Sequence, residues 1–370
     1  MKNRFYYKNI FMYGSLQSVG HTEEYFVRHT EKLVVYIIMP RVQGRNNILR
    51  IYRSGRLARE FSVWSSGNFF FYYTSWLFHY WKFILTFFDK SEPLLVFSGH
   101  PISFFGMTIQ KLLLPHVSYA YWVGDYFPPV HWSLILFEKL KKFYHDRVSY
   151  TYYLSDRINE LFNGRIVQLP AKRTVMWGVA PYKGSQKVLS QPFCLLFVGV
   201  IRPSQGIEDL LMFLKETPQV HLSIIGVCEA ALYTKYMNII GEFKLTERVW
   251  FPNTFVDDKE LKKLAKRHHV GIALYEKGEH TATHYTDPGK VKTYIEMGLP
   301  VVMTNTSVIA PFVIKYKAGE VIEDVSQLPR VLRRIKKEYQ EYQKGIRKFV
   351  EHFEFERYYK DALKALEKKV

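Results

Sequence analysis

The segment TDPGKVK, Thr286–Lys292, carries residue types that suit the binding of a phosphate group. Pro288 sets a turn, and Gly289 lets a ligand approach the backbone closely. The helical pattern that follows presents free backbone N–H groups at its first turn, and Lys290 adds a full positive charge. The turn chemistry alone also fits an ordinary helix start with a surface lysine.

Two residues of the first half are candidates for acid–base chemistry. His100 follows the apolar run PLLVFSG, and Asp125 follows YAYWVG, so both are expected at the carboxyl end of a buried strand. Either side chain can accept a proton from a hydroxyl group, and we predict these two as the catalytic residues. Ordinary turn chemistry explains both positions as well, because Pro101 follows His100 and a Tyr-Phe-Pro-Pro turn follows Asp125.

Elements that can position these residues follow from alternating apolar runs and helical patterns. The runs of the first half are NIFMYGS, KLVVYIIMP, PLLVFSGHP, VSYAYWVGD and RVSYTYYLSD, and those of the second half are FCLLFVGV, VHLSIIGV, RVWFPN, HVGIALYE, LPVVMTN and GEVIE. Strands that alternate with helices predict an α/β protein with parallel sheets. The alternation pauses in MWGVAPYKGSQKVLSQP, Met176–Pro192, which we interpret as a linker between two domains. The chain length of 370 residues also fits two domains.

The second half resembles the donor domain of two-domain (GT-B) glycosyltransferases of the group 1, family 4-like kind. The resemblance covers Phe193–Glu323 through LLFVGVIRPSQGIEDLL, LSIIGV, RVWFPNTFVDD, DPGKVKTYIEMGLPVVMTN and AGEVIE in that order. The first half is similar to the acceptor domain through YGSLQSVGHTEEYF, VGDYFPP, YLSDRINEL and MWGV. Motif order and spacing make this match more specific than a lone glycine-rich loop.

The resemblance implies a domain plan and a set of ligand contacts. It implies two Rossmann-like domains facing a cleft: an acceptor domain over 1–178, a linker over 179–191, a donor domain over 192–348, and a C-terminal helix over 349–370 that returns to the first domain. Gly14 and Gly20 would bracket a loop on the acceptor side. Predicted donor contacts are Gly199, Arg202, Gln205, Gly226, Asp287, Gly289, Lys290 and Thr293.

The chain departs from the family pattern at several of these positions. Many relatives carry an Arg and a Lys where this chain has Val200 and Gln205, which leaves Arg202 and Lys290 to hold a diphosphate. A subgroup with two Glu residues eight apart would need them at Tyr285 and Thr293, and Glu296 is a weaker substitute. Either the donor is held differently, which we favour, or catalysis has been lost and the chain is a non-catalytic binding protein or scaffold.

Composition adds an expectation about location. The formal net charge is +18 and aromatic residues make up 17% of the chain, which suits an anionic membrane, a nucleic acid, or simply a solvated surface. The aromatic segment Phe69–Phe88 contains His79 and Lys82, and we interpret it as a buried or interfacial helix in preference to a membrane span. We expect a nucleotide diphosphate sugar, a glycan or lipid-linked acceptor and an anionic membrane surface as partners, and no nucleic acid.

Few residues favour other chemistry. Cys194 and Cys228 are the only cysteines, in no metal or disulfide pattern, and the two histidines of EKGEHTATHYTD have no third ligand at metal spacing. The polar loop that holds them, with Glu279, His280, His284 and Asp287, suits sugar hydroxyls. With no signal peptide recognised, the sequence predicts a cytoplasmic transferase, retaining by resemblance, with no cofactor or metal, at the inner face of the cell membrane.

Overall fold

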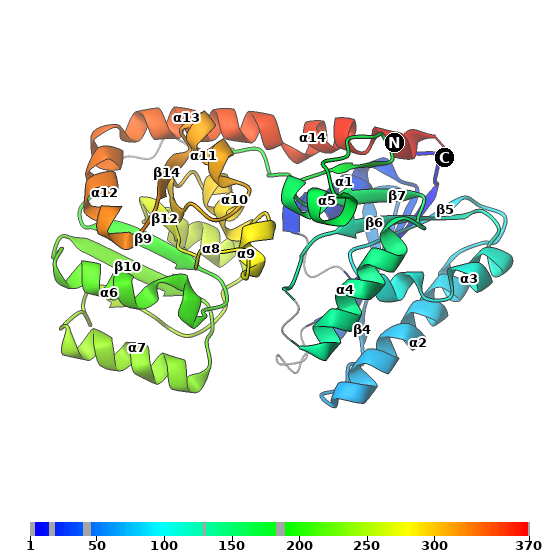
Figure 1. Ribbon diagram of the computed structural model, residues 1–370, viewed down its shortest axis with the longest axis horizontal. Helices are drawn as coiled ribbons and strands as arrows, with labels where there is room; N and C mark the ends of the chain where they lie inside the picture. Colours follow the sequence, from blue (N-terminus) through cyan, green and yellow to red (C-terminus); the bar gives the residue numbers. More distant parts are fainter. Residues whose placement is uncertain (1–3, 15–18, 40–45, 129–130, 183–188, 369–370) are drawn as a thin grey trace. The chain divides into compact units, whose positions relative to one another are not determined.

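The computed structural model describes residues 4–14, 19–39, 46–128, 131–182 and 189–368, which form two compact units (Figure 1). Unit 1 comprises Met1–Gly178 and Phe355–Val370, and unit 2 comprises Val179–Glu354. Segment 179–191 is thus grouped with unit 2, and the chain returns to unit 1 at Phe355.

Unit 1 is built on an eight-stranded sheet with the order β4-β3-β2-β1-β5-β6-β7-β8. Its strands are β1 (Asn9–Tyr13), β2 (Lys32–Ile37), β3 (Asn47–Arg53), β4 (Arg56–Val63), β5 (Leu94–Ser98), β6 (Val117–Val123), β7 (Tyr150–Tyr153) and β8 (Lys172–Thr174). Pairing is parallel from β2 to β8, while β3 and β4 form an antiparallel hairpin at one edge. The central strands β1, β5 and β6 are buried throughout, as expected for a parallel sheet covered on both faces.

The helices of unit 1 flank this sheet (Figure 1). They are α1 (Thr22–His29), α2 (Phe69–Phe87), α3 (Met107–Leu113), α4 (Trp132–His145), α5 (Asp156–Asn163) and α14 (Phe355–Ala362), with short 3₁₀ turns at Val19–His21, Pro101–Phe104 and Lys364–Glu367. The aromatic segment forms α2, which begins where the Asn68 side chain accepts hydrogen bonds from the backbone N–H groups of Phe70 and Phe71. In the described part of the chain, no helix has both the length and the apolar character needed to cross a bilayer.

Unit 2 is built on a six-stranded sheet with the order β11-β10-β9-β12-β13-β14, parallel throughout. Its strands are β9 (Phe193–Val198), β10 (Val220–Ile225), β11 (Val249–Trp250), β12 (Val270–Ala273), β13 (Val301–Thr304) and β14 (Gly319–Ile322). Its helices are α6 (Ile207–Lys215), α7 (Ala230–Glu242), α8 (Asp258–Ala265), α9 (Ala282–Tyr285), α10 (Gly289–Glu296), α11 (Ala310–Tyr316), α12 (Leu328–Lys337) and α13 (Tyr339–Phe353), with 3₁₀ turns at Pro203–Gln205 and Val325–Gln327.

The predicted α/β class and parallel sheets are confirmed, with two local differences. The helical pattern Gln327–Phe349 predicts one helix, but the structure breaks it at Glu338, which leaves α12 and α13. The C-terminal pattern from Phe355 ends as α14 followed by the short 3₁₀ turn. In both sheets the first strand of the unit is central, so loops that follow neighbouring strands meet at the carboxyl edge.

Candidate functional site

Two glycines meet where β9 and β10 end. Gly199 has φ 125° and Gly226 has φ 152°, backbone conformations that favour glycine. A Cβ atom built on Gly226 would lie 1.8 Å from the carbonyl oxygen of Gly199, so no side chain fits between the two loops. We call Gly199 and Gly226 the glycine corner. It leaves bare backbone at the carboxyl edge of the sheet, as predicted for a site where a ligand approaches the main chain.

Lys290 lies beside the glycine corner, with Nζ 3.7 Å from the position that a Cβ atom of Gly199 would take. Its Nζ atom is buried and has no hydrogen-bond partner among the described residues. Nζ lies 4.2 Å from the ring centre of Phe197 and 5.2 Å from that of Tyr275, whose own hydroxyl is buried and also lacks a partner in the described structure. Burial, and then the charge of Arg202, lowers the pKa of Lys290 to about 7.

This environment is unfavourable for an ammonium group on its own. Two aromatic faces supply some cation–π attraction, but they do not replace the lost hydration or an anionic partner. An anion bound at the glycine corner would supply both charge and hydrogen-bond acceptors. The sequence predicted Lys290 as a phosphate contact, but it gave no sign of the missing partner, and it did not single out Tyr275.

Helix α10 is fixed in place by Tyr294, a residue that the sequence did not single out. The Tyr294 hydroxyl accepts a hydrogen bond from the Val198 N–H at 2.7 Å and donates one to the Ile272 carbonyl oxygen at 3.0 Å. One side chain thus joins the helix to two neighbouring strands. Gly271 makes room for it, because a Cβ atom there would lie 2.2 Å from the Tyr294 ring. The position of Lys290, one turn earlier, depends on this contact.

The loop after β9 is closed by its own residues. Gln205 Oε1 accepts a hydrogen bond from the Arg202 N–H, and the Gln205 N–H donates to the Arg202 carbonyl oxygen, both at 3.3 Å. The Arg202 side chain is exposed, and its charge acts on Lys290. The structure therefore brings Arg202 and Lys290 to one place, while the Gln205 amide oxygen stabilises the loop.

Asp287, unlike Lys290, has a partner of opposite charge in the described structure. The Asp287 carboxylate is buried and forms an ion pair with Lys292, with 2.5 Å between Oδ2 and Nζ. Lys292 is also buried, and its Nζ lies 4.7 Å from the ring centre of Phe353 in α13. Burial lowers the pKa of Lys292 and Asp287 opposes this change. The Asp287 carboxylate thus stabilises the turn through its ion pair with Lys292. Its predicted role was a direct contact with the donor.

The positions of the missing Glu pair fall at the end of α9 and within α10. Tyr285 is the last residue of α9, and Thr293 donates a hydrogen bond from Oγ1 to the Gly289 carbonyl oxygen at 3.1 Å. Because its hydrogen is used in that bond, the Thr293 hydroxyl can only accept a hydrogen bond from a ligand. It cannot bind two ribose hydroxyls as a carboxylate would. The possible substitute, Glu296, accepts a hydrogen bond from the Ala180 N–H at 2.8 Å.

The polar loop before α10 is open to solvent. Glu279 and His280 are exposed, and His280 Nε2 lies 3.3 Å from Glu276 Oε1. His284 is half-buried, with its ring centre 4.9 Å from that of Tyr285. Glu279 and His280 thus reach solvent in the segment before α10, and the binding of sugar hydroxyls by this segment stays a prediction.

In unit 1, His100 packs against Gly14 at the carboxyl ends of β5 and β1. A Cβ atom on Gly14, which has φ 78°, would lie 3.2 Å from His100 Cβ. His100 Nδ1 accepts a hydrogen bond from the Ile102 N–H at 3.2 Å, and burial, aided by the charge of Lys141, lowers the pKa of His100 to about 4. The neutral ring then carries its hydrogen on Nε2. This geometry favours hydrogen-bond donation to an oxygen atom over the predicted removal of a proton.

Asp125 is exposed, two residues beyond β6, and a buried ion pair holds its loop. Lys141 Nζ donates a hydrogen bond to the Asp125 carbonyl oxygen and lies 2.9 Å from Glu138 Oε1, which accepts from the Phe127 N–H at 3.3 Å. Glu138 and Lys141 are both buried on α4, and burial raises the pKa of Glu138 and lowers that of Lys141. The sequence did not single out this pair, although FEKLKKF places both charges on one helical face.

Gly20 contacts the C-terminal helix. Its carbonyl oxygen accepts a hydrogen bond from the Tyr359 hydroxyl at 2.6 Å, and the same hydroxyl accepts one from the Gly178 N–H at 2.7 Å. A Cβ atom on Gly20 would lie 2.7 Å from the Trp177 ring. Gly20 is thus required by packing within unit 1, whereas residues 15–18 of the predicted acceptor-side loop lie outside the described residues.

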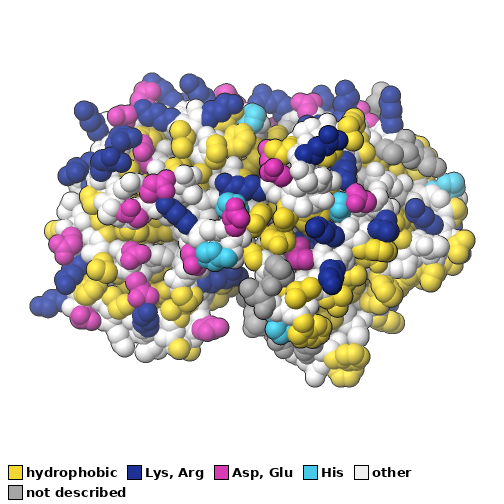
Figure 2. Space-filling model, viewed as in Figure 1, with side chains coloured by type: hydrophobic (Ala, Val, Ile, Leu, Met, Phe, Trp, Pro, Cys, Tyr) yellow, Lys and Arg dark blue, Asp and Glu magenta, His cyan; other side chains and the backbone are white. Residues whose placement is uncertain are grey.

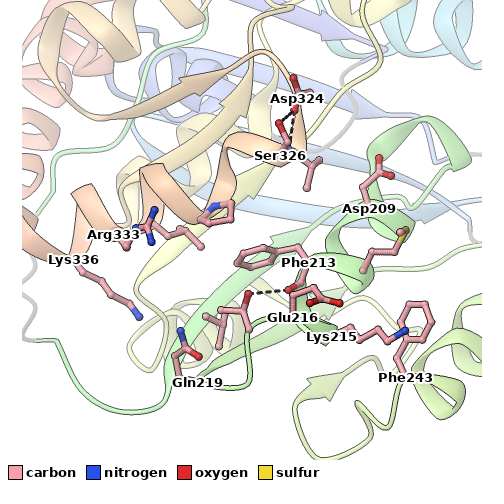
Figure 3. A pocket seen from close by; sticks show the side chains of 16 residues that line it. Asp209, Phe213, Lys215, Glu216, Gln219, Phe243, Asp324, Ser326, Arg333 and Lys336 are labelled. Carbon is pink, nitrogen blue, oxygen red and sulfur yellow. Dashed lines mark hydrogen bonds between the residues drawn. The ribbon is translucent and has the colours of Figure 1, made fainter.

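A surface cavity of about 770 Å³ lies elsewhere in unit 2 (Figure 3). Its lining includes Lys215, Gln219, Asp324, Arg333 and Lys336. The lining lies along α6 and α12 between Asp324 and Gln219, and it includes neither the glycine corner nor Lys290. Size alone therefore does not identify the site. Our candidate is the glycine corner, where bare backbone meets a cation that has no hydrogen-bond partner in the described part of the chain.

The two Rossmann-like sheets, with donor-type glycine loops on the second, define the GT-B fold of glycosyltransferases. Residues 232–366 match the family model described as Glucosyltransferase 3-like, C-terminal domain. Together with the structural neighbours below, this match confirms the resemblance drawn from the sequence. A comparison with curated protein sequences finds no match.

Solved structures with this fold include three informative neighbours. HepE from Anabaena, in complex with UDP and glucose, is 12% identical with a TM-score of 0.60, over 96% of this chain and 95% of that one. Sucrose-phosphate synthase from Thermosynechococcus elongatus is 15% identical with a TM-score of 0.59, over 77% and 75%. The pneumococcal O-GlcNAc transferase GtfA, in complex with UDP and GlcNAc, is 14% identical with a TM-score of 0.57, over 87% and 67%.

Proposed function

We propose that this protein is a glycosyltransferase that moves a sugar from a UDP-sugar to a glycan acceptor. The observation that carries the proposal is the buried Lys290 ammonium, which lies beside the glycine corner without a hydrogen-bond partner among the described residues. A diphosphate is the ligand that this arrangement suits, since it needs close backbone approach and positive charge together. The family match supports glycosyl transfer, and the UDP complexes of HepE and GtfA support uridine as the base.

The reaction breaks the bond between the sugar C1 atom and the diphosphate oxygen and forms one to an acceptor oxygen. Lys290, Arg202 and the N–H groups that begin α10 stabilise the negative charge that develops on the diphosphate. Asp125 takes the proton from the acceptor hydroxyl, and His100 donates a hydrogen bond from Nε2 to a substrate oxygen. Thr293 accepts one hydrogen bond from the nucleotide. We retain the expectation that the product keeps the donor's anomeric configuration.

The acceptor that we propose is a lipid-linked saccharide or a growing polysaccharide at the inner face of the cell membrane.

The donor and its sugar are tested first, by thermal shift and calorimetry with UDP, UMP and several UDP-sugars. Binding should raise the melting temperature. UDP should bind more tightly than UMP by about tenfold or more, because we expect Lys290 and Arg202 to hold the second phosphate. Equal affinity for UMP and UDP would contradict the assignment of the glycine corner as a diphosphate site.

A non-catalytic binding protein is the alternative function. The replacement of the expected Glu pair by Tyr285 and Thr293 favours it. The two functions differ in turnover: a transferase releases UDP when a suitable UDP-sugar and acceptor, or water, are present. Tight UDP-sugar binding without UDP release across a panel of glycan acceptors would support the alternative.

A further inference from the structure

Three helices of unit 1 present large apolar side chains to solvent. Exposed examples are Phe71 and Phe78 on α2, Leu112 on α3, and Trp132, Leu136 and Phe143 on α4, and we call these six residues the apolar face. Leu112 is 79% exposed, Trp132 67% and Phe78 65%. Figure 2 shows hydrophobic side chains gathered where Figure 1 places α2, α3 and α4. Exposed apolar side chains that gather on one surface usually mark an interaction site.

On α2 and α4, the spacing places the exposed apolar residues along one outer side of the helix. On α2, Phe71, Phe78 and Lys82 are separated by seven and four residues, which places them along one side of the helix. On α4, Trp132, Leu136 and Phe143 follow the same rule, with the buried pair of Glu138 and Lys141 on the inner side. The outer stripe remains exposed to solvent, although the Phe143 ring also contacts Arg147, whose Cζ lies 3.8 Å from the ring centre.

The exposed charges on these helices have one sign. Exposed lysines lie among the apolar side chains: Lys82 on α2, Lys111 on α3, and Lys139 and Lys142 on α4. Glu138 is the single carboxylate in the sequences of the three helices, and it is buried against Lys141. Exposed aromatics mixed with uncompensated lysines complement an anionic lipid surface. A second copy of the same face would bring lysines against lysines.

We infer that α2, α3 and α4 dock unit 1 onto an anionic membrane. The helices lie on the lipid surface, since no helix in the described residues is able to span a bilayer. Apolar side chains enter the interface and the lysines contact acidic headgroups. The surface rests on no assumption about the donor site in unit 2.

Membrane docking also favours one class of acceptor, and this part of the inference rests on the proposed function. The inner side of α4 holds the loop of Asp125 through Glu138 and Lys141. A cavity of about 180 Å³ opens beside the same helix, and its lining includes Tyr126, Lys139 and Lys142. Membrane contact through α4 would place the predicted base next to the lipid surface. A lipid-linked saccharide is thus the acceptor class that this geometry favours over a free polysaccharide.

The test is co-sedimentation of the full chain with vesicles of phosphatidylcholine alone or with added phosphatidylglycerol, at low and high salt. We expect binding to the anionic vesicles that falls steeply with salt. Replacing Lys82, Lys111, Lys139 and Lys142 by Gln should lower the partition coefficient by at least about tenfold. The matched control replaces four exposed lysines of unit 2, Lys259, Lys262, Lys263 and Lys266, by Gln. It has the same net charge as the first variant but should leave binding within about twofold of the parent.

A second pair of variants tests the apolar part. Trp132→Ser with Phe143→Ser should weaken vesicle binding, whereas Trp250→Ser with Phe255→Ser, two exposed aromatics of unit 2, should not. Unchanged UDP binding by each variant shows that unit 2 is intact and keeps this test separate from that of the donor site. The inference is overturned if the parent does not bind anionic vesicles, if both lysine variants lose binding equally, or if the α4 variants change only self-association measured by sedimentation.

Discussion

At the scale of single residues, Lys290 stands out because its environment opposes stability. A buried ammonium group with no hydrogen-bond partner in the described structure destabilises the folded state. Such a residue is expected where binding, not folding, determines the residue type. The same side chain should therefore affect stability and affinity in opposite directions.

Lys290→Met tests this expectation. Methionine fills similar space without the charge, so the free energy of unfolding should rise by about 1 to 3 kcal/mol. UDP binding should weaken by about 1.5 to 3 kcal/mol, because a charge-assisted contact is lost. Urea unfolding and calorimetry measure the two effects. Lys266→Met, at an exposed lysine, is the control, and unchanged UDP affinity in Lys290→Met would remove Lys290 from the site.

The pH dependence of both quantities follows from the pKa of Lys290, which is about 7 against an ordinary value of 10.5. The unfolded chain holds this proton to higher pH than the folded chain does, so stability rises between about pH 7 and 10. The stability difference between Lys290→Met and the parent should be largest below pH 7 and shrink through that window. UDP favours the protonated lysine, so affinity should fall as pH rises above about 7, and titration calorimetry at several pH values checks this. A stability difference that is constant with pH would contradict this role of burial.

Asp125→Asn tests the base. The amide keeps the size of the side chain but cannot take the proton, so turnover should fall about a hundredfold or more with donor affinity little changed. Asp89→Asn, at another exposed aspartate of unit 1, should retain the parent rate. If Asp125→Asn also retains the parent rate, another group is the base.

At the scale of elements, the sequence predicts the sheets well and the side-chain partners poorly. Continuous apolar runs identified every strand of unit 2 and five strands of unit 1. The hairpin of β3 and β4 was missed because β4 is exposed along its length, so it has no apolar run to detect. The break at Glu338 was missed because the residues directly beside it include good helix formers and no Gly or Pro.

The candidate site shows the same division. Local sequence placed Lys290 at the start of a helix and the glycines at strand ends, because turn chemistry is local. It did not predict that Asp287 is buried with Lys292, since that burial depends on Phe353, about sixty residues later. It also did not predict the contact of Tyr294 with Val198 and Ile272, which requires three separate elements to meet.

Gly271→Ala tests how α10 is held on the sheet. The added methyl would lie 2.2 Å from the Tyr294 ring, so the helix or the strand must shift, at a cost of about 1 to 3 kcal/mol in stability. The shift should also displace Lys290 and weaken UDP binding. Gly241→Ala in α7 is the control, because nothing lies within 4 Å of its Cβ position, and it should stabilise by about 0.5 to 1 kcal/mol. Equal effects of the two changes in chemical denaturation would contradict the contact.

At the scale of the whole molecule, unit 1 is completed by the last residues of the chain. Besides the contacts of Tyr359, the Tyr6 N–H donates to the Leu366 carbonyl oxygen at 3.0 Å, and Arg4 pairs with Glu367 at 2.5 Å. Tyr359→Phe leaves the buried Gly178 N–H without its acceptor, so unit 1 should lose about 1 to 3 kcal/mol. Calorimetric unfolding should then show an earlier transition for unit 1, while the UDP-stabilised transition of unit 2 stays in place. A shift of the UDP-stabilised transition instead would contradict this division.

The split of unit 1 around unit 2 also sets an order in time. Residues 179–354 form unit 2 as one continuous piece of the chain, whereas unit 1 combines segments from both sides of it. Unit 1 has to wait for α14, although most of it emerged first. Until α14 is added, Tyr25 and Trp122, whose rings pack against Tyr359, lack that cover, which makes the first half of the nascent chain the part most dependent on protection from aggregation.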